Sequence, residues 1–207
     1  MSWLARVRQR SQDRSDSKSE EPSDAAPVER ASPGLAALFE GLCEDGRHSI
    51  LDLGCAGNRH LRVLGGFARQ IRFAGLTPEV PRGEALRSAL EALPGSASRP
   101  YDVILAWDVF DRLDEAERRA MIDRILGLTA PGARLYTVVA SSQAAMRAPA
   151  RSTLVDLSHV SQVTVGPPEP ARPPLLPGQV ERLLTPFEIV HAFSLRIGLR
   201  EYVAVRR

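Results

Sequence analysis

One apolar run followed by small residues stands out in the chain: Ser49-Ile50-Leu51-Asp52-Leu53-Gly54-Cys55-Ala56-Gly57-Asn58-Arg59-His60. A run that ends in Asp-Leu-Gly and leads into a helical pattern is typical of a buried strand that turns tightly into a helix. Because Gly54, Ala56 and Gly57 have small or absent side chains, the backbone there can approach a nucleotide-like ligand closely. The free N–H groups of the following helix would point toward that ligand. The sequence therefore predicts a ligand-binding turn at residues 53–58.

Strands and helices are expected to alternate on both sides of this turn. The expected strands are 50–53, 71–76, 101–107 and 134–140, and the helices between them are 58–68, 81–93 and one capped by Asp114 and Glu117. The strand at 101–107 is apolar throughout and should be buried on both faces. This order predicts a mostly parallel sheet with helices on both faces.

The flanking regions carry further helix signals. Ser32-Pro33 has the pattern of an N-cap followed by proline at the first helical position. Thr185-Pro186-Phe187-Glu188 has the same pattern with a capping-box glutamate, which predicts a helix that Gly198 ends. Residues 130–133 should turn into the strand at 134–140. A last strand is expected at 200–205.

Residues 49–140 resemble the class I S-adenosylmethionine (SAM) dependent methyltransferases. Residues 49–60 resemble the first motif of that family, in which an acidic residue precedes a Gly-x-Gly-x-Gly-like turn. Residues 101–113 resemble its fourth strand and the short loop that follows. The resemblance implies an α/β, Rossmann-like methyltransferase fold with a mostly parallel sheet, shortened around strand three.

The resemblance also implies where SAM would bind. The cofactor would lie over residues 54–58, with Trp107 and Asp108 flanking it. The implied cofactor-binding residues are Asp52, Gly54, Ala56, Gly57, Asn58, Thr77, Trp107 and Asp108. No residue is singled out as a general base, no metal site is indicated, and an aspartate after the fourth strand could equally cap the next turn.

This chain departs from the family pattern at the cofactor contacts. Ala56 and Asn58 stand where the second and third glycines are usual, and Leu76 and Thr77 stand where an acidic residue binds the ribose. Loss of that charge-assisted hydrogen bond should weaken binding about 10- to 150-fold unless Thr77 or Glu79 replaces it. The part of the fold that would bind adenine is also shortened. This holds whether residues 81–93 form a helix or residues 84–88 form a short strand.

These sequence features are consistent with two alternative functions. The first is a SAM-dependent methyltransferase acting on a small-molecule or other non-nucleic-acid acceptor. The second is a catalytically inactive methyltransferase-like subunit that binds a protein partner. Ribose recognition by Thr77 or Glu79 would favour the enzyme, and a pocket filled by Leu76 would favour the binding subunit. A nicotinamide dinucleotide enzyme fits less well, because the third glycine of that fingerprint and the later acidic residue are absent.

Composition limits the partners and the location. The chain has 207 residues, 43% of them hydrophobic and 25% charged, which is typical of one globular domain. A net charge of +2 indicates no basic field for nucleic acid. Cys43 and Cys55 are the only cysteines and suggest no disulfide framework, so a cytoplasmic location is expected. No apolar run is long enough to span a membrane.

Two segments are expected to lie outside the regular structure. Residues 1–31 have too few large apolar groups to fold. They are expected to form a disordered tail ahead of a domain at 32–207. Trp3, Leu4 and Val7 could form a short basic amphipathic helix that makes a weak contact. Residues 167–178 are rich in proline and should be extended and stiff.

Overall fold

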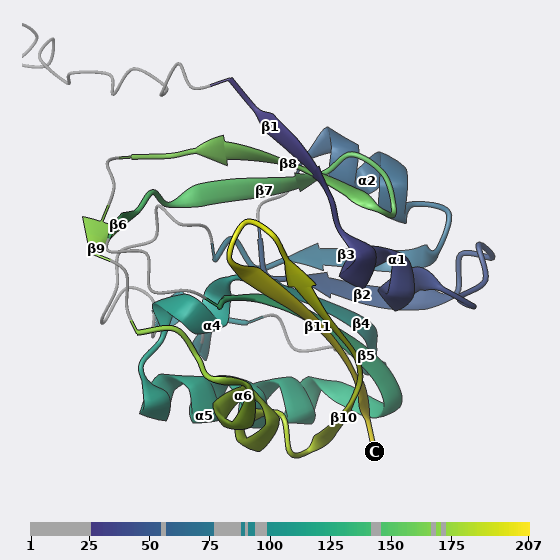
Figure 1. Cartoon of the computed structure of the whole chain (residues 1–207). Helices are drawn as coiled ribbons and strands as arrows, with labels where there is room; N and C mark the ends of the chain where they lie inside the picture. The colour runs from purple at the N-terminus through teal and green to yellow at the C-terminus, as the bar shows by residue number, and fades with distance from the viewer. Residues whose placement is uncertain are drawn as a thin grey trace, which may run out of the picture.

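The computed structural model describes residues 26–54, 57–76, 88–89, 91–93, 99–141, 146–166, 169–170 and 173–207. A six-stranded sheet forms the centre of the molecule (Figure 1). Its strands are β2 (His48–Asp52), β3 (Ala68–Phe73), β4 (Tyr101–Trp107), β5 (Thr129–Ala140), β10 (Phe187–Leu195) and β11 (Leu199–Arg206). The sheet order is β10-β11-β5-β4-β2-β3.

The sheet is parallel in its first half and antiparallel at its other edge. β2 pairs in parallel with both β3 and β4, and β4 pairs in parallel with β5. β11 is antiparallel to β5, and β10 is antiparallel to β11. Most of the chain between β3 and β4, residues 77–87, 90 and 94–98, lies outside the described residues, so the shortening around strand three stays a prediction.

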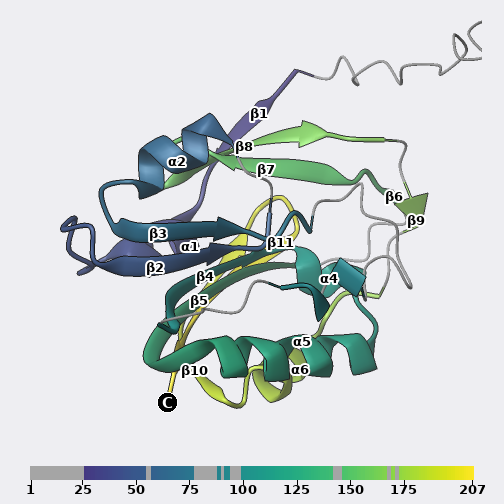
Figure 2. The same ribbon diagram turned by 180° about the vertical axis from the view of Figure 1, so that it is seen from behind.

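Helices cover both faces of the sheet (Figures 1 and 2). One face is covered by α1 (Pro33–Phe39) and α2 (Asn58–Leu64), and the other by α5 (Glu115–Leu128) and α6 (Pro177–Leu183). A four-residue helix, α4 (Val109–Arg112), follows β4. The core is divided accordingly: Ile50, Val103 and Leu105 face α1 and α2, whereas Leu51 and Ile104 face α5. This alternation is what strands buried on both faces require.

A second, smaller sheet lies over α2. It consists of β1 (Val28–Ala31), β8 (His159–Thr164) and β7 (Ala150–Leu154), paired antiparallel in that order. A two-stranded ladder joins β6 (Met146–Arg147) to β9 (Glu169–Pro170). Residues 150–164 thus contribute two of the three strands of this sheet. The ordered structure also begins earlier than expected, because residues 28–31, assigned to the tail, form β1.

The prediction of a helix after Thr185 is wrong. Residues 187–195 form β10, and the helix of this region, α6, lies earlier. Thr185 lies just after α6, and its hydroxyl donates to the carbonyl oxygens of Glu181 and Arg182. The local cap pattern is overridden because residues 187–195 pair with β11 along their whole length. Pairing with a neighbouring strand satisfies the backbone groups that a helix would otherwise satisfy internally.

Other element boundaries differ by a few residues. The strand expected at 71–76 begins at Ala68, because α2 ends at Leu64 before the two glycines. The turn expected at 130–133 lies within β5, where Gly132 has a φ of 88°. The helix expected at 81–93 falls mostly outside the described residues, although residues 88–89 and 91 are helical. No described helix has both the length and the apolar character that crossing a membrane requires.

Candidate functional site

The carboxyl ends of β2 and β4 meet at a buried carboxylate. Asp52, the last residue of β2, has no solvent exposure. Its Oδ1 accepts hydrogen bonds from the backbone N–H of Gly54 at 2.8 Å and from the indole Nε1–H of Trp107 at 2.6 Å. Its Oδ2 lies 2.8 Å from Nδ1 of His60. Both carboxylate oxygens are therefore bound by groups of the chain itself.

His60 lies on α2 and completes this cluster. Only 1% of the residue is exposed, and its ring stacks on that of Trp107 with centroids 5.7 Å apart. Nδ1 of His60 and Oδ2 of Asp52 share one hydrogen bond. Nε2 is buried without a hydrogen-bond partner among the described residues.

Trp107 holds an unusual backbone conformation. Its φ is +50°, a left-handed value that bulky L-residues rarely adopt. The hydroxyl of Thr137 on β5 donates to the carbonyl oxygen of Trp107 at 2.8 Å. The indole is 5% exposed and also packs edge-on against Tyr136, with ring centroids 5.8 Å apart. Neighbouring strands and rings thus stabilise a conformation that the residue itself disfavours.

The glycines near the end of β2 differ in their surroundings. Among the described residues, a Cβ added at Gly57 or Gly75 would have no neighbour within 4 Å, and Gly75 has a φ of +68°. A Cβ at Gly54 would instead meet Asp52 Oδ1 and Trp107 Nε1, each at 3.1 Å. The indole therefore lies directly against the turn at Gly54, whereas Gly57 and Gly75 have room beside them.

Leu76 follows β3 and faces the interior. The residue is 2% exposed and packs in the core on the α5 side of the sheet. Its N–H donates to the carbonyl oxygen of Leu53 at 2.7 Å, and its own carbonyl oxygen accepts from Arg112 at 3.1 Å. An aliphatic side chain in this position offers no hydrogen bond to a ligand.

The structure brings together some of the expected site residues. Asp52, Gly54 and Trp107 are in contact, and Gly57 and Asn58 form the start of α2. Asp108 stands at the N-cap position of α4, and its side chain does not cap that helix. The expected positions outside the described residues are Ala56, Thr77 and Glu79.

Sequence reasoning did not predict the partners of Asp52. No sequence pattern links His60 to Asp52, and Trp107 was expected to flank a cofactor. The spacing of eight residues between Asp52 and His60 is only a weak signal that they are in contact, because Asp52 ends a strand and His60 lies on the next helix. Asp111 is the other aspartate shortly after β4. It accepts a hydrogen bond from the N–H of Ala140, which supports a structural role.

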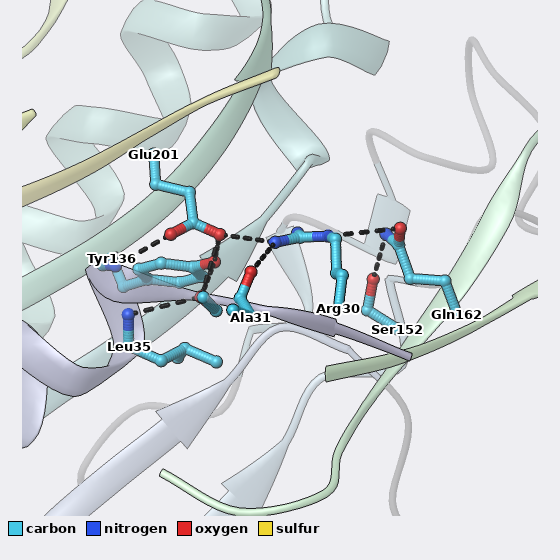
Figure 3. A network of polar contacts seen from close by, with 9 residues as sticks. Arg30, Ala31, Leu35, Tyr136, Ser152, Gln162 and Glu201 are labelled. Carbon is cyan, nitrogen blue, oxygen red and sulfur yellow. Dashed lines mark hydrogen bonds and ion pairs between the residues drawn. The ribbon is translucent and has the colours of Figure 1, made fainter. Parts of the chain in front are cut away.

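A second buried polar cluster lies around Glu201 on β11 (Figure 3). Glu201 has no solvent exposure and accepts hydrogen bonds from Arg30, Ser32, Gly34 and Tyr136 at 2.7 to 3.0 Å. Arg30 also bonds to Gln162 on β8. Burial raises the pKa of the Tyr136 hydroxyl, and the nearby negative charge of Glu201 raises it further. This cluster ties β1 and α1 to the main sheet.

The sequence matches no protein-family model and no curated protein. Solved structures are similar at low identity. TehB from Haemophilus influenzae has a TM-score of 0.50 and 14% identity, over 85% of this chain and 62% of TehB. The glycopeptide N-methyltransferase MtfA with S-adenosyl-L-homocysteine has a TM-score of 0.47 and 15% identity, over 84% of this chain and 89% of MtfA. The 1,6-didemethyltoxoflavin-N1-methyltransferase of Burkholderia thailandensis has a TM-score of 0.48 and 16% identity, over 84% of this chain and 76% of that enzyme.

At these identities the likeness concerns the fold. The sheet order and the likeness to TehB define the fold class: the chain has a class I methyltransferase-like α/β fold. The resemblance predicted from residues 49–140 is thereby confirmed at the level of architecture. Fold by itself does not fix activity, which depends on the site.

Proposed function

We propose that this chain is a SAM-dependent methyltransferase acting on a small-molecule or other non-nucleic-acid acceptor. The observation that carries the proposal is that β2 ends at Asp52 beside β4, with Gly54 and the N-cap of α2, Gly57, shortly after it in the chain. Open α/β sheets bind their ligands outside the carboxyl ends of such strands. A net charge of only +2 supports an acceptor other than nucleic acid. The sparse cysteines support a cytoplasmic location.

The described backbone fits a cofactor of this kind. The space beside Gly57 and Gly75 allows a ligand to approach the main chain at the end of β2 and just past β3. The side chains fit less completely, because Asp52 is already hydrogen-bonded and Leu76 is apolar. We therefore propose that residues 54, 57 and 58 would hold SAM mainly through the backbone. Asp52 would act by fixing the shape of the turn through the N–H of Gly54.

Bound SAM supplies an electrophilic methyl group on a sulfonium, and methyl transfer is an in-line substitution. The contribution of the chain is then positioning, which orients the reacting atoms and excludes water. Trp107 and Asp108, where β4 ends, are proposed to flank the bound cofactor. No described side chain is assigned as a general base.

A second function is supported by a specific observation. The side chain of Leu76 is buried where the family places its ribose-binding acid, and both oxygens of Asp52 are occupied. These features favour a methyltransferase fold that no longer binds SAM and instead serves as a binding or assembly subunit. The two functions differ in one measurable property, the affinity for SAM.

Calorimetric titration with SAM and with S-adenosylhomocysteine tests the proposal. Gly57→Asp is the blocking variant, because residue 57 is the N-cap of α2, where aspartate is favoured, and its side chain would enter the open space. Gly178→Asp is the matched control. It makes the same substitution in the first turn of α6, where a Cβ also meets nothing within 4 Å.

Micromolar binding to the wild type and to Gly178→Asp, lost in Gly57→Asp, is the result expected for the enzyme. Absence of detectable heat at millimolar SAM, in protein shown to be folded by circular dichroism, would contradict it. That second result would favour the binding subunit and direct the work to a protein partner.

A further inference from the structure

We propose that the indole of Trp107 is a displaceable plug, which occupies the hydrogen-bonding position on Asp52 that a bound ligand takes when the indole moves away. This inference rests on the proposed function and concerns how the site opens. Its starting point is the contact of 2.6 Å between Nε1 of Trp107 and Oδ1 of Asp52. A buried carboxylate is stable only while donors surround it, so any opening requires a replacement donor.

The place of the indole indicates that it fills ligand space. A Cβ at Gly54 would lie 3.1 Å from Nε1 and 3.2 Å from Cδ1 of Trp107, so the ring presses against the turn. In a glycine turn that approaches a ligand closely, the position beside the first glycine is where a ligand atom would be expected. Here a side chain of the chain itself holds that position.

The backbone of Trp107 provides a reason why the plug can move. The φ of +50° is disfavoured for a tryptophan, and such outliers persist only where surrounding contacts hold them. The retaining contacts include the Asp52 hydrogen bond, the Thr137 hydroxyl on the Trp107 carbonyl, the pairing with Thr137 of β5, the His60 stack and the Tyr136 edge. Trp107 is the last residue of β4, and the next residue, Asp108, is the N-cap of the short helix α4. A change in the backbone dihedrals of Trp107 therefore does not break a continuing strand.

The groups behind the indole define the ligand chemistry. Departure of Trp107 would leave Oδ1 of Asp52 short of one donor and uncover the ring of His60, whose Nε2 already lacks a partner among the described residues. The carboxylate oxygen Oδ1 would then face the opened space as an acceptor. The group that replaces the indole must therefore bring N–H or O–H donors, as an amine or a hydroxyl does.

Tryptophan fluorescence reports on this movement directly. Trp3 and Trp107 are the only tryptophans, so in a Trp3→Phe background all tryptophan emission comes from Trp107. Addition of SAM is expected to shift that emission to longer wavelength and to increase its quenching by acrylamide about threefold, because the indole leaves a buried site.

The Trp107→Phe variant tests the same point by affinity. It keeps an aromatic ring and removes the N–H donor, so SAM is expected to bind about tenfold more tightly than to the wild type. Tyr136→Phe is the matched control. It removes a buried hydroxyl that faces Glu201 and keeps the ring beside Trp107, so the affinity for SAM should not change.

The outcomes separate the plug from the enzyme proposal. Binding of SAM without change in Trp107 emission, and with equal affinity in Trp107→Phe, would overturn the plug and leave the methyltransferase in place. Binding to Trp107→Phe but not to the wild type would support the plug and contradict the methyltransferase. Absence of binding to both proteins, each folded by circular dichroism, would overturn both.

Discussion

At the scale of single residues, buried charge is concentrated in two carboxylates. Asp52 is satisfied by Gly54, His60 and Trp107, and Glu201 joins β11 to the N-terminal segment. A buried carboxylate with several donors is costly to disturb, because removing one partner leaves the others unpaired. Substitutions at these positions should therefore act far more strongly than substitutions of exposed charges.

The Glu201→Gln variant is expected to lower the free energy of unfolding by about 3 kcal/mol. The amide cannot neutralise Arg30, whose side chain is 12% exposed, and its NH₂ group would face other donors. Glu188→Gln is the control, since Glu188 forms an exposed pair with Arg207 and should change stability by less than about 0.5 kcal/mol. Urea denaturation measures both, and similar losses in the two variants would contradict the prediction.

The Gly34→Ala variant should lower stability although alanine favours helices. A Cβ at residue 34 would lie 2.9 Å from Glu201 and 2.9 Å from Tyr136, so the buried cluster would have to shift. The expected cost is about 1–3 kcal/mol. Gly127→Ala in α5 meets nothing within 4 Å and should gain about 0.5–1 kcal/mol. Thermal unfolding compares the two, and a gain in both would show that the cluster adapts.

Tyr136 should make stability fall at high pH. Its pKa is raised in the fold by burial and by Glu201, so above pH 10 the unfolded chain releases a proton that the folded chain keeps. Stability from this group is full below pH 10 and is lost as pH rises. Tyr136→Phe should be less stable at pH 8 but decline less between pH 9 and pH 11. Urea midpoints across this range measure the slope, and equal declines would exclude Tyr136 as the cause.

At the scale of secondary-structure elements, α5 follows local rules closely. The side chain of Asp114 accepts from the N–H of Glu117, and the side chain of Glu117 accepts from the N–H of Asp114. Met121, Ile122 and Ile125 form the buried face. The cap was predicted from sequence, because caps depend on residues within a few positions of one another.

The Asp114→Ala variant should lower stability by about 1 kcal/mol, because the N-terminal N–H groups of α5 lose their acceptor. Glu115→Ala is the matched control in the same turn. Its exposed pair with Arg119 contributes only about 0.3–0.5 kcal/mol. Chemical denaturation distinguishes the two, and equal effects would mean that the cap contributes no more than a surface ion pair.

The C-terminal hairpin shows where local rules fail. Thr185-Pro186-Phe187-Glu188 has a strong helix-start pattern, yet Phe187 begins a strand that pairs with Arg206 at its start and with Leu199 at its end. The pairing partner lies as far as 19 residues away, so no local pattern contains it. Phe187 is buried against the α6 side of the sheet, which adds packing that a helix at this position would not provide.

At the scale of the whole molecule, one sheet connects both halves of the core. Leu154 and Val160 of the small sheet pack in the same cluster as Ile50 and Val103 of the main sheet. The opposite face packs against α5 and α6 through the same strands. Because every layer shares these strands, we expect the layers to unfold together.

In a Trp3→Phe background, the fluorescence of Trp107 and far-ultraviolet circular dichroism should therefore give coincident denaturation curves. The emission of Trp107 reports on the region where β4 ends beside α2, and circular dichroism reports on all helices and strands. A fluorescence transition at lower denaturant concentration would show that the region around β4 and α2 opens first. That result would contradict a single cooperative unit.

The fold class could be predicted from the order of strands and helices, and the buried strand β4 and the cap of α5 from residues close together in the chain. The tertiary structure alone decided three features: the pairing of β1 with β8, the strand at 187–195 and the capture of Asp52 by His60 and Trp107. These depend on groups brought together from 8 to more than 100 residues apart. Such contacts form only when the whole chain packs, and no local preference encodes them.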